Sequence, residues 1–369
     1  MIDVIKLFNF FKNKNITFFT GVPDSVLKNM DVFFKKKNKN THIITTNEGS
    51  AVSLGIGYYL AKKKIPGIYL QNSGLSNALN PLLSIANPKV YSIPLLLIIG
   101  WRGSPNLKDE PQHKIKGKIT RELLNLSGIK NITLNSEKDF NNLSKLINYA
   151  KSKKVPVACL IKKNILKSKK IQKLPKVAYK TNISRSYFIN KFFDLLDSNS
   201  KVISTTGFIS RDVHEITKKL KKNPKQFFYM VGGMGHSSMV SLGYSLNSKK
   251  RVICLDGDGS LLMHLGATFT IARFANKNFK HILLNNNSHD SVGGQPTYIE
   301  NMNLKLFIKS LGYKKYFYLN DKKKLKLIIK SFLNSTGPSF LEVKINNKSN
   351  SNLTRPKNFK KIKNDFMRT

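Results

Sequence analysis

The chain has 369 residues, of which 40% are hydrophobic, and it carries a formal net charge of +44 at pH 7. The length suits two domains of ordinary size, and the composition excludes a disordered polymer. No run approaches the roughly 18 apolar residues that cross a bilayer, and the N-terminus lacks the pattern of a signal peptide, so we expect a cytoplasmic protein without a membrane partner.

The excess of positive charge raises the alternative of a basic nucleic-acid-binding protein. Eight of the 64 basic residues are arginines, and the other 56 are lysines spread along the whole chain. Surfaces that clamp phosphates or read bases more often use arginine, whose planar guanidinium donates paired hydrogen bonds. We therefore predict lysine-rich solvated faces and no nucleic-acid partner, with weak binding to polyanions at low salt.

In the first half of the chain, short apolar runs alternate with Gly-containing turns and helical patterns. Residues 51–62 have the repeat of small and apolar side chains that predicts a helix. The runs predicted to form strands are 17–19, 42–44, 67–70, 95–99 and 155–161.

The second half repeats this scheme, with strands predicted at 201–204, 227–230, 251–255, 281–284 and 340–345. Apolar runs without strict alternation are typical of parallel strands buried on both faces. The fold class is therefore α/β, with two domains that are each a parallel sheet flanked by helices. Cys159 and Cys254 lie inside such runs, which predicts two buried thiols and no disulfide.

A lysine-rich segment without acidic residues separates the two halves and contains Pro175. Such a segment is typical of a charged linker. We therefore expect a first α/β domain at 1–165, a basic linker at 166–182 and a second α/β domain at 183–345. The remaining residues, 346–369, are polar and basic, which predicts a flexible tail or a lid.

A Gly-Asp-Gly sequence at 257–259 directly follows the predicted strand 251–255. Glycines there let the backbone approach an anion closely, and the N–H groups of the next helix point toward it. The following strand delivers Asn285 and Asn286 to the same edge of the sheet. A carboxylate, an amide oxygen and a main-chain carbonyl are ligands that Mg²⁺ prefers. A bare Gly-Asp-Gly also occurs in surface turns, but the two strands and their spacing favour a phosphate and Mg²⁺ site.

Two residues outside this motif have a structural and a functional interpretation. Glu48 follows a predicted strand and opens a helix, where the helix dipole stabilises an acidic side chain. Met234, within Gly232–Gly235, is the kind of side chain that fills a gap in a core. Taken alone, each is explained by the structural interpretation.

The combination of Gly257–Gly259 with Asn285 and Asn286 resembles the signature of thiamine-diphosphate-dependent enzymes. The resemblance implies that Mg²⁺ is bound by Asp258, the side chain of Asn286 and the main-chain carbonyl of Ser288. It also implies a role for each of the other cofactor-binding residues. Those at the diphosphate are Gly257, Gly259 and Ser260, whereas Glu48 serves the aminopyrimidine ring and Met234 supports the bent shape of the cofactor.

The resemblance also has consequences for the domains. It makes 1–165 a pyrimidine-binding-type domain and 183–345 a diphosphate- and Mg-binding-type domain, so one cofactor needs both. In this superfamily the two usually belong to different subunits, which implies a homo-oligomer with the site between subunits. Many relatives carry a central domain, for which the linker leaves no room, and this implies a short decarboxylase.

Longer stretches resemble the phosphonopyruvate decarboxylases in particular; they are residues 21–25, 101–113, 285–297 and 353–356. One departure is Asn287-Ser288, where Gly-Ala is more usual. The implied reaction is the decarboxylation of 3-phosphonopyruvate to phosphonoacetaldehyde and CO₂ in phosphonate biosynthesis. The alternatives within the class are a sulfopyruvate decarboxylase or another short 2-oxo acid decarboxylase.

The candidates for proton transfer and substrate orientation, besides Glu48, are Asp24, His113, His289 and Asp290. Asp24 also fits the cap of a helix at 25–34, and His113 also fits an exposed position in a loop. The candidates for contact with the phosphonate are Arg102, Lys108 and Arg355, and an ordinary surface charge explains each of these equally well.

Overall fold

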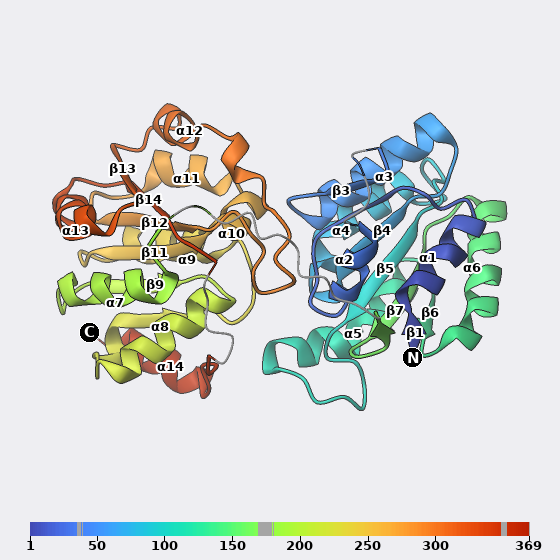
Figure 1. Ribbon diagram of the computed structural model, residues 1–369, viewed down its shortest axis with the longest axis horizontal. Coiled ribbons are helices and arrows are strands. Elements are labelled where there is room, and N and C mark those ends of the chain that lie inside the picture. The colour runs from blue at the N-terminus through green and yellow to red at the C-terminus, as the bar shows by residue number, and fades with distance from the viewer. Residues whose placement is uncertain (35–37, 39, 169–178, 180, 348–352, 369) are drawn as a thin grey trace. The chain divides into compact units, whose positions relative to one another are not determined.

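The computed structural model describes all residues except 35–37, 39, 169–178, 180, 348–352 and 369. The chain forms two compact units, Met1–Leu174 and Pro175–Thr369 (Figure 1). Of the expected linker 166–182, residues 169–178 and 180 lie outside the described residues. Its first two residues are not a linker, because Leu166–Lys167 form strand β8, which pairs in parallel with β1 (Ile2–Asp3).

Unit 1 contains a six-stranded sheet in the order β3-β2-β4-β5-β7-β6, in which every pair is parallel. The strands of this sheet are β2 (Phe19–Gly21), β3 (His42–Ile44), β4 (Gly67–Gln71), β5 (Leu96–Trp101), β6 (Lys130–Leu134) and β7 (Val157–Lys162). The helices of the unit are α1 (Val4–Asn13), α2 (Asp31–Phe34), α3 (Glu48–Lys62), α4 (Leu75–Pro81), α5 (Pro111–Leu126) and α6 (Phe140–Lys153).

Unit 2 contains a second six-stranded parallel sheet, in the order β10-β9-β11-β12-β14-β13. Its strands are β9 (Lys201–Ser204), β10 (Phe227–Tyr229), β11 (Val252–Gly257), β12 (Phe279–Asn285), β13 (Lys315–Leu319) and β14 (Ser339–Lys344). Its helices are α7 (Arg185–Leu195), α8 (Phe208–Lys219), α9 (Ser237–Leu246), α10 (Asp258–Met263), α11 (Ala267–Phe274), α12 (Leu304–Ser310), α13 (Leu325–Asn334) and α14 (Phe359–Met367).

Each sheet is buried between two layers of helices, as Figure 1 shows. In β5, Leu96 and Ile98 pack with α1, α2 and α6, whereas Leu97 and Ile99 pack with α3, α4 and α5. In unit 2, one face packs against α7, α8 and α13 and the other against α9, α10, α11 and α12. Because alternate side chains enter two cores, the strands have continuous apolar runs. The expected α/β class is confirmed.

At two further places the local structure differs from an interpretation that the sequence allowed. His113 lies in the first turn of α5, which begins with Pro111 at a position that favours proline, and not in a loop. The segment 346–369 is not a flexible tail throughout, because α14 packs against β10 and its Phe366 is buried. Among the described residues, no helix is both long and apolar enough to cross a membrane.

Candidate functional site

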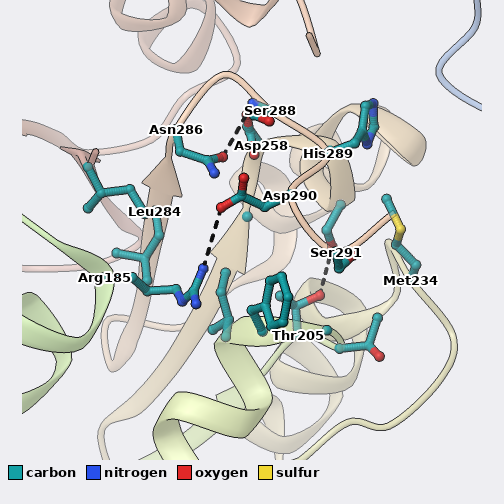
Figure 2. A pocket seen from close by; sticks show the side chains of 18 residues that line it. Arg185, Thr205, Met234, Asp258, Leu284, Asn286, Ser288, His289, Asp290 and Ser291 are labelled. Atoms are coloured by element: carbon teal, nitrogen blue, oxygen red, sulfur yellow. Dashed lines mark hydrogen bonds and ion pairs between the residues drawn. The ribbon is translucent and has the colours of Figure 1, made fainter. Parts of the chain in front are cut away.

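In each unit, the order of the strands reverses direction at one point of the sheet. In unit 2 the chain moves from β9 to β10 on one side and continues through β11 and β12 on the other. Open parallel sheets bind ligands at the carboxyl ends of the strands that flank such a point. The pocket in Figure 2 lies there, lined by residues that follow β9, β11 and β12.

Asp258 lines this pocket and is buried. Its Oδ2 atom accepts hydrogen bonds from the main-chain N of Ser288 at 3.0 Å and from Oγ1 of Thr297 at 2.8 Å. Burial raises the pKa of the Asp258 carboxyl to about 7, although these bonds oppose the shift. A cation bound to this carboxylate would stabilise its ionised form.

The other two predicted Mg²⁺ ligands lie beside Asp258. The main-chain N of Ser288 also donates to Oδ1 of Asn286 at 3.3 Å, so both side-chain oxygens approach the same peptide group. Asn286 and Ser288 are both buried. The structure therefore brings together all three predicted residues, and they offer the oxygen donors that suit Mg²⁺.

The side chains around Gly259 leave no room for a side chain at this position. A Cβ atom added to Gly259 would lie 2.8 Å from Nδ1 of His289 and 3.4 Å from Cε of Met234. Ser260 Oγ lies 2.9 Å from Oγ1 of Thr205 and accepts a hydrogen bond from the N of Gly235. Met234, His289 and Ser260, three of the predicted residues, are thus gathered at the Gly-Asp-Gly turn. Burial lowers the pKa of His289 to about 4, so its imidazole is neutral at pH 7.

Arg185 is a residue of this pocket that sequence reasoning missed. It is 5% exposed, its Nε donates to Oδ2 of Asp212, and its Nη1 lies 3.9 Å from Oδ2 of Asp290. Its Nη2 atom is buried without a hydrogen-bond partner among the described residues. Figure 2 shows the guanidinium pointing toward Asp290. The pairing gives predicted residue Asp290 a charged neighbour and places a cation in the pocket.

Unit 1 has its own reversal point, between β2 and β4, and Glu48 lies near it. Glu48 is the first residue of α3, is buried, and accepts a hydrogen bond from Nδ2 of Asn77 at 2.8 Å. A Cβ atom on Gly74 would lie 1.9 Å from Oε1 of Glu48, so any other residue there would displace this carboxyl. Burial raises the pKa of Glu48, against the bond from Asn77 and the charge of Lys116.

Asp24 follows β2 and is buried at the same reversal point. Its Oδ2 accepts from the main-chain N of Val26 at 2.8 Å and of Leu27 at 2.9 Å, and its Oδ1 accepts from Gln71. The carboxylate therefore caps the turn that follows, and burial also raises its pKa. The helix expected at 25–34 is a turn followed by a 3₁₀ turn at Lys28–Met30 and the short α2.

The three candidates for phosphonate contact lie in different surroundings. Arg102 donates two hydrogen bonds to the carboxylate of Asp109, which neutralises its charge, and a third to Oγ of Ser25. Lys108 is exposed. Arg355 is half-buried in the C-terminal segment, where the neighbouring Thr354 donates its N–H to Glu215 of α8.

A fourth cation, Lys116, was missed by sequence reasoning. It lies one turn after His113 in α5, donates to the carbonyl of Ser73 at 3.3 Å, and attracts the ionised form of Glu48. No sequence motif marks Lys116, Gln71 or Asn77. Their contacts with the two buried carboxyls depend on how the strands and helices of unit 1 pack.

Comparison with known proteins gives a consistent result for both units. Residues 6–124 match the N-terminal TPP-binding domain of thiamine pyrophosphate enzymes, and residues 206–343 match the C-terminal TPP-binding domain. A phosphonopyruvate decarboxylase of Streptomyces viridochromogenes is 30% identical over 357 residues, which cover 93% of this chain and 88% of that protein. The chain belongs to the thiamine pyrophosphate enzyme family.

Other relatives extend the comparison. A sulfopyruvate decarboxylase of Methanosarcina acetivorans is 26% identical over 318 residues, or 81% of this chain and 80% of that protein. The sulfopyruvate decarboxylase subunit beta of Methanothermobacter thermautotrophicus is 34% identical over 144 residues, or 39% of this chain and 72% of that protein. The family and the expected decarboxylase class are thereby confirmed.

The residues present fit the cofactor of this family. In unit 2, the buried carboxyl of Asp258 with its raised pKa, the oxygen donors around it and the Gly-Asp-Gly turn suit a metal-bound diphosphate. In unit 1, Glu48 is a buried carboxyl with a raised pKa, which suits exchange of a proton with a ring nitrogen.

Proposed function

We propose that this enzyme decarboxylates 3-phosphonopyruvate to phosphonoacetaldehyde and CO₂, using thiamine diphosphate held by Mg²⁺. The observation that carries the proposal is the cluster of Asp258, Asn286 and Ser288 at the reversal point of unit 2. Similarity to phosphonopyruvate decarboxylases over 93% of the chain supports the choice of substrate.

In this proposal, unit 2 holds the charged end of the cofactor. Asp258, the amide oxygen of Asn286 and the carbonyl of Ser288 hold Mg²⁺, while Gly257, Gly259 and Ser260 meet the diphosphate. Because the pKa of Asp258 is about 7 without a metal, binding of Mg²⁺ displaces a proton. Met234, near Gly259, supports the bent cofactor.

Unit 1 supplies the proton chemistry. Thiamine diphosphate, when bound, supplies the group that accepts the electron pair released as CO₂ leaves. Glu48 holds a proton at the aminopyrimidine nitrogen N1′, and its burial favours sharing of that proton. In this proposal, Asp24 and His113 orient the substrate and return a proton. Asp24 is also buried, and its pKa is raised.

His289 and Asp290 act from the unit 2 side in this proposal. The neutral His289 orients polar groups by hydrogen bonding without adding charge. Asp290 is held beside Arg185, which limits its movement. Arg102, Lys108 and Arg355 remain the proposed contacts of the phosphonate, and Lys116 is added to them because it lies close enough to attract the charge of Glu48.

The proposal extends to a homo-oligomer in which Glu48 of one subunit serves the cofactor bound at Asp258 of another. Co-expression of Glu48→Gln and Asp258→Asn chains tests this, since each variant alone lacks one half of every site. Random mixing in a dimer restores about a quarter of the wild-type sites. Activity that stays at the level of the separate variants would contradict the shared site.

The second candidate substrate is sulfopyruvate, because sulfopyruvate decarboxylases match parts or most of the chain. A CO₂-release assay with phosphonopyruvate, sulfopyruvate and pyruvate, each with both cofactors, decides between them. We expect the highest kcat/KM with phosphonopyruvate. A higher value with either other acid would overturn the substrate assignment and leave the cofactor assignment intact.

The same preparations test the cofactors and the alternative of nucleic-acid binding. Thiamine diphosphate with Mg²⁺ should raise the melting temperature, and decarboxylation should be insensitive to salt. A melting temperature that does not respond to the cofactors would contradict the enzyme proposal.

A further inference from the structure

Three side chains that can bind a transition metal lie together beneath the Gly-Asp-Gly turn. Cys254 and Asp256 are two residues apart on β11, so they project from the same face of the strand. His281 on β12 is the register partner of Cys254. The cluster therefore results from the pairing of two central strands, and it is separate from the pocket residues of Figure 2.

The ligand atoms of these residues converge in a fully enclosed space. Sγ of Cys254, a carboxylate oxygen of Asp256 and a ring nitrogen of His281 all lie within 4.8 Å of one another. The exposures of the three side chains are 0%, 1% and 0%. Two of the converging atoms, Oδ2 of Asp256 and Nε2 of His281, have no hydrogen-bond partner in the described structure.

The distance between Oδ2 of Asp256 and Nε2 of His281 suits two ligands of one metal ion better than a hydrogen bond between them. Nε2 of His281 lies 3.5 Å from Oδ2 of Asp256. A charged N–H···O bond is about 2.7–2.9 Å long, so the pair is too far apart for a good ion-pair hydrogen bond. Two nitrogen or oxygen ligands of one tetrahedral Zn²⁺, at bond lengths of about 2.0–2.1 Å, lie about 3.3–3.4 Å apart.

The outer atoms of the same side chains are already held in place. Nδ1 of His281 lies 3.1 Å from the hydroxyl of Tyr313. Oδ1 of Asp256 accepts from the N of Gly257 at 2.9 Å and from Oγ of Ser237 at 3.2 Å. Metal-binding His and carboxylate groups characteristically have such partners on the atom that faces away from the metal.

Apart from its own polar atoms, the cluster has apolar neighbours. The cluster lies in a core with Leu242, Phe279 and Phe340, where a polar atom without a partner is costly. Burial and the neighbouring Asp256 raise the pKa of the Cys254 thiol well above its usual value, and hydrogen bonds with Ser241 and Ser237 oppose this shift. A thiolate, a carboxylate and a neutral imidazole together neutralise one divalent ion.

We propose that Cys254, Asp256 and His281 bind one Zn²⁺ ion per chain, which is taken up during folding and is distinct from the Mg²⁺ of the active site. Sulfur and imidazole ligands select such a metal over Mg²⁺. The ion ties β11 to β12, the strands that end in Gly257 and Asn285, and its binding adds to the stability of unit 2.

Metal analysis of the untagged full-length protein, grown with added zinc and dialysed against EDTA, tests the proposal. Dialysis removes the accessible Mg²⁺, and we expect about one equivalent of zinc to remain per chain. Protein grown with cobalt should show the absorption of a thiolate–cobalt bond. Cys254→Ser and His281→Asn should lose the metal, and Cys254→Ser should also lose this absorption.

Two variants serve as matched controls. Cys159→Ser removes the other buried thiol, in unit 1, and Asp258→Asn removes the Mg²⁺ ligand; both should keep the zinc. Wild-type protein that retains less than about a tenth of an equivalent overturns the proposal, as does zinc content unchanged in Cys254→Ser. If the cluster variants fail to fold, the wild-type zinc content and cobalt spectrum decide. None of these measurements depends on decarboxylase activity.

Discussion

Unit 1 and unit 2 place their strands in the same order and reverse direction at equivalent points, between β2 and β4 and between β9 and β11. The side chains at the two points differ. In unit 1, the buried carboxyls Glu48 and Asp24 lie among amide donors, and burial raises the pKa of both. In unit 2, glycines, hydroxyls and two carboxyls, Asp258 and Asp290, surround a pocket.

The difference teaches that one sheet topology provides two kinds of site. Glu48 follows β3 and Met234 follows β10, which occupy equivalent places in the two sheets. A buried carboxyl therefore stands in one unit where an apolar side chain stands in the other. Function follows from the residues on the loops, and not from the sheet itself.

The largest expected effect is the loss of kcat in Glu48→Gln, which tests proton transfer separately from cofactor binding. Glu48→Gln keeps the shape and the bond to Asn77 but removes the ionisable group, so kcat should fall by about a thousandfold. Thiamine diphosphate with Mg²⁺ should still raise the melting temperature of the variant, because unit 2 is unchanged. If the variant lost both its activity and this stabilisation, the assignment of proton transfer to unit 1 and cofactor binding to unit 2 would be contradicted.

The matching change in unit 2 is Asp258→Asn. It should abolish the stabilisation by the cofactors, which amounts to about 2.7 kcal/mol at a ligand concentration a hundredfold above Kd. The folded pKa of about 7 lies above the usual 3.8, so the ionised wild-type carboxyl destabilises the cofactor-free protein at pH 8. The cofactor-free variant should therefore be more stable there, by roughly 1–4 kcal/mol in urea unfolding. Equal stability would contradict the burial of the charge.

Gly74→Ala tests how closely unit 1 positions Glu48. The added methyl group meets Oε1 at 1.9 Å and must displace the carboxyl, so kcat should fall by about a hundredfold. Gly57→Ala in α3 is the control, since nothing lies within 4 Å of its added methyl group. That variant should keep full activity. Equal rates for both variants would show that the position of Glu48 is not critical.

The smallest effect is a dependence of Mg²⁺ affinity on pH. Because the carboxyl of Asp258 is protonated below its pKa of about 7, affinity should be constant at higher pH. Below that pH it should fall by about tenfold per unit. Thr297→Val removes a hydrogen bond that favours the ionised form, so the midpoint should move to higher pH. Calorimetric titration between pH 6 and 9 measures both, and an affinity that stays constant over this whole range would contradict the effect of burial.

The proximity of Asp258, Asn286 and Ser288 could be predicted from the sequence, because it follows from three local features: a strand, a Gly-Asp-Gly turn, and a second strand that ends in Asn285. The strands β6 and β13 were not predicted, because they lie at sheet edges and are partly exposed, without a continuous apolar run. Helix α14 was also missed, although Phe359, Ile362 and Phe366 have the spacing of one helical face.

The missed site residues share a different cause. Arg185 contacts Asp212 and Asp290, and Lys116 lies near Glu48, across long stretches of sequence. A single charged residue in a chain with 64 basic residues gives no pattern to detect. The ion pair of Arg102 with Asp109 could not be inferred either, because Arg102 is one of many basic residues. Both residues belong to a stretch that resembles the family.

Helix α14 has a consequence for how the chain tolerates shortening. Its Phe366 covers Ile203 and Val252, and the main-chain oxygen of Phe366 accepts from Nζ of the buried Lys201. A chain cut before Asn358 would expose this apolar face beside β10, an outermost strand of its sheet. Exposed apolar edges pair with other chains. Such a truncated protein would aggregate during expression even though its pocket residues are all present.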